Sequence, residues 1–151
     1  PAVASWPDFN KETWTQAVKE AEAEARPNPP QIIMGNDWHE GALSLAWGGA
    51  QAAGVANAIS FFNEDAEHWR PPVRVDLTTT NPPWDNRLGD AEASWQGLLH
   101  FLRRELAERD AWVLSGNPDI SRALRMKSDK NMFLSSGGVE LRWLKYHLHE
   151  Y

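Results

Sequence analysis

The residues best suited to chemistry form the tetrapeptide Asn81-Pro82-Pro83-Trp84, which follows the β-rich residues 73–80. Each proline holds φ at about −65°, lacks a backbone N–H and pushes the preceding residue out of the helical region, so we expect a stiff loop at the end of a strand. Asn81 can accept a hydrogen bond from an exocyclic amine, and Trp84 offers a face on which a base gains about 1–3 kcal/mol by stacking. The loop is therefore a candidate binding site for a planar ring that carries an amino group. On the alternative interpretation, the prolines only end a strand and Trp84 belongs to the core.

Two carboxylates follow two other expected strands. Residues 31–35 predict a short buried strand that is followed by Asp37, and residues 58–62 predict a second strand that is followed by Asp65. In open α/β sheets, ligands bind outside the carboxyl ends of the strands. Asp37 could there accept hydrogen bonds from the ribose hydroxyls of a nucleotide-like cofactor, and Asp65 could receive an adenine amine. The alternatives are that Asp37 caps the next helix and that Asp65 binds local backbone N–H groups in a turn.

The sequence predicts no metal site. The chain has no cysteine, so it offers no thiolate ligand and no disulfide. His147 and His149 are two residues apart and share one face of an expected strand, but the sequence shows no third ligand beside them. His39, in the loop after Asp37, is expected to be idle.

Length and charge limit the function further. The 151 residues are enough for one domain, and a net charge of −6 is unlike that of a free-standing nucleic-acid binder. If the chain acts on RNA, most phosphate contacts should come from elsewhere. The sequence shows no transmembrane span or signal peptide, so we expect a soluble protein of the cytoplasm or of an organellar matrix.

Alternating strands and helices must position these residues. Residues 1–30 contain a leading helix, with Asn10 as its N-cap and a Phe9–Trp14 contact, and a proline-rich linker. Residues 31–151 contain the strand-helix units and a terminal hairpin. The further elements expected are helices over residues 40–53, 91–109 and 119–124 and strands over residues 73–77, 111–115, 131–134 and 139–148. The Gly48-Gly49 pair in the second helix indicates close packing against a neighbour.

This order of elements resembles that of the class I S-adenosylmethionine-dependent methyltransferases, which implies an α/β fold with a Rossmann-like sheet and a terminal antiparallel hairpin. The tetrapeptide also matches the (Asp/Asn/Ser)-Pro-Pro-(Tyr/Phe/Trp) motif of amino-methyltransferases. More closely, the chain resembles the catalytic domain of the 23S rRNA guanine-N2 methyltransferases that carry an N-terminal THUMP domain. The motifs that carry this likeness are Trp6-Pro7-Asp8-Phe9, Gly35-Asn36-Asp37, Ala53-Gly54-Val55, Asn81-Pro82-Pro83-Trp84 with Arg87-Leu88-Gly89, Leu114-Ser115-Gly116-Asn117-Pro118 and Gly137-Gly138-Val139-Glu140.

The resemblance implies a role for each candidate site residue. Asp37 would hold the ribose of S-adenosylmethionine, and Asp65 would hold its adenine amine. Asn81, Pro82, Pro83 and Trp84 would hold the target guanine of an rRNA substrate, flipped out of its stack.

The chain departs from the family pattern at its beginning. The family starts with a strand and a glycine-rich loop that cradle the methionine end of the cofactor, and no such loop precedes Asp37. In this fold the first strand lies between the strand ending at Gly35 and the strand ending at Thr80. Without it, two strand edges stay unpaired, so we expect another chain or an upstream segment to complete the sheet and the fragment to fold poorly alone. His39 also replaces an expected acidic residue, and Asp85-Asn86 replaces the usual Gly-Glu.

Three functions remain open at this point. The first is an RNA guanine-N2 methyltransferase, or the base-binding part of one, which is an enzyme only when the glycine-rich loop is supplied. The second is a catalytically inactive, methyltransferase-like scaffold subunit of a larger RNA–protein assembly such as an organellar ribosome. The third is methylation of a protein amide, which shares the tetrapeptide but not the rest of the match.

Overall fold

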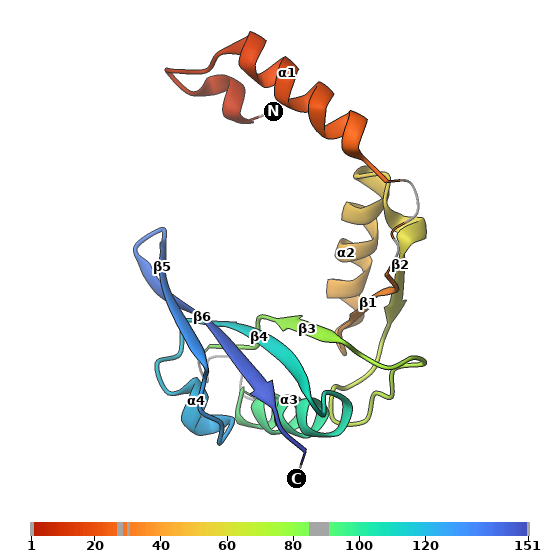
Figure 1. The fold of residues 1–151 in the computed structure, drawn as a ribbon, viewed down its shortest axis with the longest axis vertical. Helices are drawn as coiled ribbons and strands as arrows, with labels where there is room; N and C mark the ends of the chain where they lie inside the picture. The colour runs from red at the N-terminus through yellow and green to blue at the C-terminus, as the bar shows by residue number, and fades with distance from the viewer. Residues whose placement is uncertain (1, 27–28, 30, 85–90, 151) are drawn as a thin grey trace.

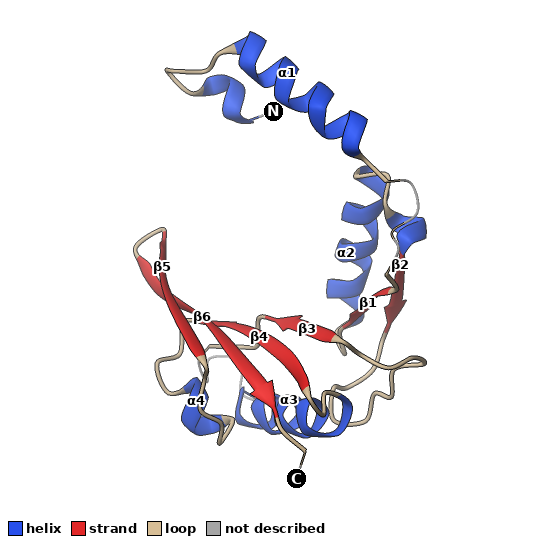
Figure 2. Ribbon diagram, viewed as in Figure 1, coloured by secondary structure: helices blue, strands red, loops and turns tan. Residues whose placement is uncertain are grey.

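The computed structural model describes residues 2–26, 29, 31–84 and 91–150. A helix separates β1 from β2 and β3 from β4, a loop joins β2 to β3, and the chain ends in a hairpin (Figures 1 and 2). The helices are η1 Ala2–Ser5, α1 Lys11–Glu24, α2 Glu40–Ala52, η2 Ala56–Ala58, α3 Ala91–Glu105 and α4 Ile120–Ala123. The strands are β1 Ile33–Asn36, β2 Ile59–Phe62, β3 Leu77–Thr80, β4 Arg109–Ser115, β5 Lys130–Ser136 and β6 Val139–Leu148. The expected cap Asp90 and the motif residues Asp85-Asn86 and Arg87-Leu88-Gly89 lie outside the described residues.

The strands form two separate sheets. β1 and β2 pair in parallel, with Ile33 opposite Ile59 and Asn36 opposite Phe62. The second sheet has the order β3-β4-β6-β5, in which β3 and β4 are parallel and β6 is antiparallel to both of its neighbours. This arrangement confirms the predicted α/β fold with a terminal antiparallel hairpin.

A groove separates the two sheets where the missing strand is expected. This groove, here called the central slot, has a volume of about 800 Å³ and is lined by residues 31–34 and Asn36 on one side and by residues 73–80 on the other. Trp69, Leu98 and Phe101 also line it. Within the described residues, β1 pairs only with β2 and β3 pairs only with β4. The facing edges of β1 and β3 are therefore open, as the sequence predicts.

The main core lies between α3 and the four-stranded sheet. The apolar spacing of the sequence predicts an inner helix face of Trp95, Leu98, Leu99, Leu102 and Leu106. The four leucines are buried in this core, and Trp95 is partly buried against it. Their neighbours from the rest of the core are Val75, Ala111, Val113, Ile120, Leu124, Leu144, Tyr146 and Leu148. The helix ends earlier than predicted, because Glu108 takes a φ of 55° and this left-handed turn begins β4 at residue 109.

The loop after β2 joins the smaller sheet to this core. Trp69 stacks on Phe101 of α3 with ring centroids 5.4 Å apart, and Phe62 of β2 packs against the same indole. The Arg104 guanidinium donates hydrogen bonds to the carbonyls of Glu67 and Trp69 at 2.9 and 2.7 Å. These contacts hold the two sheets on either side of the central slot.

The leading helix α1 has the predicted cap but no core contact. Asn10 Oδ1 accepts a hydrogen bond from Thr13 N at 2.9 Å, and Phe9 lies against Trp14. No residue of α1 is buried, and Figure 1 shows the helix standing away from both sheets. α1 therefore carries an apolar face that the described residues leave uncovered.

Several predicted packing details are wrong. A Cβ added at Gly48 or Gly49 would meet no described atom within 4 Å, so the glycine pair makes no close packing here. β1 is only partly buried, because its inner edge faces the central slot. β3 begins at Leu77 rather than at residue 73, since pairing with β4 starts at that residue. None of the helices in the described part of the chain is long and apolar enough to cross a membrane.

The open edges predict a distinct pattern of hydrogen exchange. In the isolated chain, the amides of β1 and β3 that point into the central slot should exchange fastest, whereas amides of β4 and β6 should be protected by their two-sided pairing and the core. Exchange monitored by NMR or mass spectrometry measures both groups in one sample. Equal protection of all four strands would contradict the open-slot structure.

Candidate active site

The Asn81-Pro82-Pro83-Trp84 loop is fixed by two indole hydrogen bonds. Asn81 directly follows β3, and Trp84 Nε1 donates to its side-chain Oδ1 at 2.8 Å. Trp95 of α3 donates from its Nε1 to the Pro83 carbonyl, also at 2.8 Å. The loop is therefore held to itself and to α3, and the exposed Asn81 side chain has a defined orientation.

Trp84 is also held against the backbone that follows β4. A Cβ added at Gly116 would lie 2.7 Å from Trp84 Cε3 and 2.9 Å from Cδ2, which is closer than real side chains approach. Glycine at position 116 is thus required for the indole to lie where it does. Trp84 is half-buried, so it has a packed side and an accessible part, which is intermediate between the two predicted interpretations.

The two predicted carboxylates occupy turns at one end of the smaller sheet. Asp37 Oδ1 accepts a hydrogen bond from His39 N, and Asp65 Oδ1 accepts one from Glu67 N, each at 2.8 Å. Both side chains are exposed, and in the described part of the chain the second oxygen of each carboxylate has no hydrogen-bond donor. Each aspartate therefore shapes its own turn, as the alternative interpretation states for Asp65 but not for Asp37, and keeps one oxygen for another partner.

The cap of α2 is His39 rather than Asp37. The His39 Nδ1 atom accepts a hydrogen bond from Ala42 N at 3.3 Å. The histidine that the sequence suggests to be idle thus has a structural role at the start of the helix.

Two asparagines tie the Asp37 and Asp65 loops together. Asn36 exchanges two hydrogen bonds with the backbone of Glu64, from Nδ2 to the Glu64 carbonyl at 3.1 Å and from Glu64 N to Oδ1 at 3.2 Å. Asn63 Nδ2 donates to the carbonyls of Asp37 and Trp38, both at 2.9 Å. The sequence gives no role to either asparagine, although both lie where strands end and a side-chain amide can bind two backbone groups.

The structure thus builds the candidate site in two halves. The Asp37 and Asp65 loops form one half at the ends of β1 and β2, and residues 81–84 form the other after β3. None of these residues lines the central slot, which separates the strands that carry them. The two halves therefore lie on opposite sides of the central slot.

Comparison with solved structures defines the class of fold. The chain superposes with a TM-score of 0.77 on a methyltransferase-class protein crystallised with SAH, at 16% identity, covering 97% of this chain and 39% of that one. It superposes with a TM-score of 0.67 on TrmN from Thermus thermophilus, at 24% identity, covering 89% of this chain and 40% of that one. The fold is that of the Rossmann-like methyltransferases.

Residues 2–145 match the model of the RMKL-like methyltransferase domain, and the chain belongs to this family. It is 30% identical over 150 residues to the ribosomal RNA large subunit methyltransferase K/L of Shewanella loihica and 29% identical over 151 residues to that of Shewanella frigidimarina. These alignments cover 95% and 96% of this chain, respectively, but the chain spans only about a fifth (21%) of each relative. The predicted likeness to rRNA methyltransferases is confirmed at this level.

The close approach of Gly116 to Trp84 can be tested by a double-mutant cycle. We expect Gly116→Ala to lower the free energy of unfolding by about 1–3 kcal/mol, because its Cβ overlaps the indole. In a Trp84→Ala background the same change should cost almost nothing, since the space is then empty. Urea unfolding of the four proteins measures this coupling, and an equal cost in both backgrounds would disprove the contact.

Proposed function

We propose that this chain is the part of an S-adenosylmethionine-dependent RNA methyltransferase that holds the adenosine of the cofactor and the target base. We further propose that the target atom is the N2 amine of a guanine in large-subunit rRNA. The observation that carries this proposal is the Asn-Pro-Pro-Trp loop, which two indole hydrogen bonds hold rigid directly after β3. The names of the rRNA methyltransferase relatives support RNA as the substrate class.

The loop offers two acceptors that suit an exocyclic amine. Trp84 occupies one lone pair of Asn81 Oδ1 and leaves the second for an amine N–H. We assign the Pro82 carbonyl as the second acceptor, because within the described residues it accepts no hydrogen bond. Two acceptors on the two N–H groups of an amine would turn its nitrogen lone pair toward the methyl donor.

This geometry would accelerate the reaction by orientation rather than by a strong base. The bound cofactor supplies a methyl group on a sulfonium, which is electrophilic without further activation. The amine nitrogen forms the new N–C bond, the S–C bond breaks, and the amine proton leaves to water afterwards. Asn81 and Pro82 hold the nitrogen in line, Trp84 stacks on the flipped ring, and such positioning can account for most of the rate gain.

The carboxylate half fits the adenosine of the cofactor. The second oxygens of Asp37 and Asp65 are accessible and lie in loops that the Asn36 and Asn63 side chains hold together. We assign Asp37 to the ribose hydroxyls and Asp65 to the adenine amine, because carboxylates accept hydrogen bonds from both kinds of donor.

A strand from outside residues 1–151 would complete the site. The open edges of β1 and β3 would each bind one side of a parallel strand in the central slot, and the glycine-rich loop after that strand would hold the methionine end of the cofactor. An upstream segment or another chain could supply it. With a net charge of −6, this chain would rely on other parts of the assembly for most phosphate contacts.

The same comparisons favour the methyltransferase over the inactive scaffold. Both relatives are named as methyltransferases and come from Shewanella, which fits the bacterial cytoplasm better than an organellar matrix. Their names give ribosomal RNA as the substrate, which disfavours methylation of a protein amide.

Substitution of Asn81 tests the role of the loop. In the complete protein that contains this chain, we expect Asn81→Ala to lower the rate of methyl transfer to rRNA by roughly 100-fold or more, because the amine loses its orienting acceptor. Cofactor affinity, measured by calorimetry, should stay within about threefold. Asn131→Ala, on the exposed strand β5, is the matched control and should behave as wild type. Normal turnover by Asn81→Ala would overturn the assignment.

Substitution of Asp37 tests the cofactor half. We expect Asp37→Ala to weaken S-adenosylmethionine binding by roughly 10- to 100-fold, which corresponds to loss of hydrogen bonds to a charged group. Asp8→Ala, an exposed aspartate near the first helix, is the control. If the complete protein binds no cofactor even before substitution, the inactive scaffold is the better explanation.

A further inference from the structure

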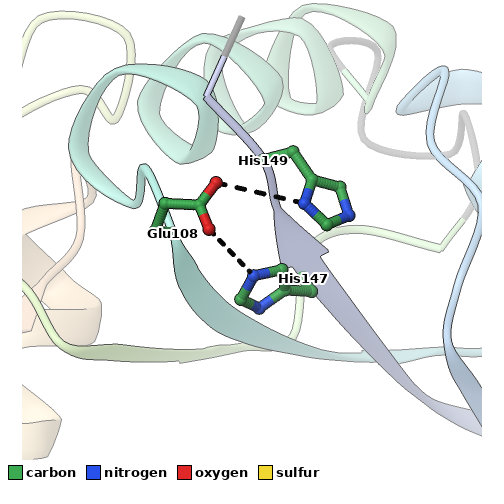
Figure 3. A group of neighbouring side chains, drawn as sticks. All are labelled: Glu108, His147 and His149. Carbon is green, nitrogen blue, oxygen red and sulfur yellow. Dashed lines mark ion pairs between the residues drawn. The ribbon is translucent and has the colours of Figure 1, made fainter.

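A second group of polar side chains lies at the opposite end of the four-stranded sheet. Glu108 precedes β4, and it faces His147 in β6 and His149 just beyond the end of that strand (Figure 3). β4 runs from residue 109 here to Ser115, whose neighbour Gly116 contacts Trp84. The seven residues of β4, which span about 20 Å, therefore separate this group from the Asn81-Pro82-Pro83-Trp84 loop.

The three side chains present ligand atoms to one another. Glu108 Oε2 lies 3.6 Å from His147 Nε2, and Glu108 Oε1 lies 4.0 Å from His149 Nδ1. A carboxylate oxygen of Glu108 and one ring nitrogen each of His147 and His149 all lie within 4.8 Å of one another. Ligands of a tetrahedral zinc ion with bonds of about 2.0–2.1 Å are roughly 3.3 Å apart, so small side-chain movements would close the site.

Surrounding groups already orient two of these ligands. Asp110 Oδ1 lies 2.9 Å from His147 Nδ1, which favours a proton on that nitrogen and leaves the lone pair of Nε2 directed at Glu108. Glu108 Oε1 accepts a hydrogen bond from Glu150 N at 2.9 Å. The backbone N–H of Glu108 donates to the Leu148 carbonyl at 2.6 Å, which fixes the turn beside the end of β6.

We propose that Glu108, His147 and His149 bind a divalent transition-metal ion of the zinc type, with Asp110 as a positioning residue behind His147. Two imidazoles and one carboxylate form a donor set that zinc accepts, and water can take the fourth position because the site is exposed. The metal would fasten the end of β6 to the turn between α3 and β4. Its distance from the Asn81-Pro82-Pro83-Trp84 loop separates this site from the proposed methyl transfer.

The sequence alone predicts no metal here because Glu108 is far from the histidines along the chain. The antiparallel pairing of β4 with β6, with Arg109 opposite Leu148, brings the third ligand to the pair. The left-handed φ of 55° at Glu108 then places this residue in the turn beside them.

Zinc binding by the complete protein tests the proposal. The hydrogen bond to Asp110 raises the pKa of His147, as does Glu108 to a smaller extent, so calorimetry is done at about pH 8, where fewer protons compete with the metal. We expect one Zn²⁺ per chain with micromolar affinity, weakened at least tenfold by His149→Ala and by Glu108→Gln. Asp110→Asn should weaken it about 10- to 100-fold if it positions His147.

A control variant and the absorption spectrum of bound Co²⁺ distinguish loss of the metal site from loss of the fold. His100 lies on α3, outside the proposed site, and its side chain pairs with Glu67. The control variant His100→Ala should therefore leave zinc affinity unchanged. His149 is mostly exposed, with 76% of its side chain accessible, so His149→Ala should keep the fold, and circular dichroism checks this. Co²⁺ bound in place of zinc should give the visible absorption of a four-coordinate ion. Failure to bind zinc, or equal binding by wild type, His149→Ala and Glu108→Gln, would show that the group is an ion-pair cluster only.

Discussion

The unpaired backbone hydrogen-bonding groups of β1 and β3 along the central slot are the main constraint on this structure. Strand N–H and C=O groups need partners when they are shielded from water, and β1 and β3 each have a neighbour on one side only within the described chain. The apolar residues along the slot reinforce this demand, since Ile33 is 44% exposed and Leu77 is 56% exposed. A parallel strand placed there would satisfy both edges and cover both side chains. It would also fix the register between the sheets, in which a slip of one residue reverses every side chain.

The two halves of the site are each ordered without that strand. Trp95 and Gly116 fix the tetrapeptide on one side, and Asn36 and Asn63 fix the aspartate loops on the other. A strand in the slot would therefore join two ordered halves rather than build either one. In the proposed function, each half therefore contributes residues whose turns are held by their own local hydrogen bonds.

Local and periodic signals predict much of this structure. The Asn10 cap, the buried face of α3 and the β5–β6 hairpin depend on neighbours in sequence or on regular spacing, and all are observed. The turn between β5 and β6 is also a local signal, because Gly137 and Gly138 both adopt the positive φ that such hairpin turns require. The open slot could be predicted because strand order follows from the family pattern.

Contacts between distant segments could not be predicted in this way. The Trp95 bond to Pro83, the space that Gly116 leaves for Trp84 and the meeting of Glu108 with His147 all depend on how α3, β4 and β6 pack. The bounds of β3 depend on the register of its partner, which the sequence does not encode locally. Close packing at Gly48 and Gly49 is predicted from the cost of two glycines within a helix, and the prediction is wrong because no described atom lies within 4 Å of a Cβ built at either position.

The central claim is methyl transfer to the amine of a guanine in large-subunit rRNA. Incubating the complete protein with unmodified large-subunit rRNA and S-adenosylmethionine that carries a deuterated methyl group, followed by digestion to nucleosides and mass spectrometry, tests it directly. The account predicts deuterated N2-methylguanosine as the labelled nucleoside. Label on another base or position would contradict the guanine assignment, and rRNA without label would contradict the proposed activity.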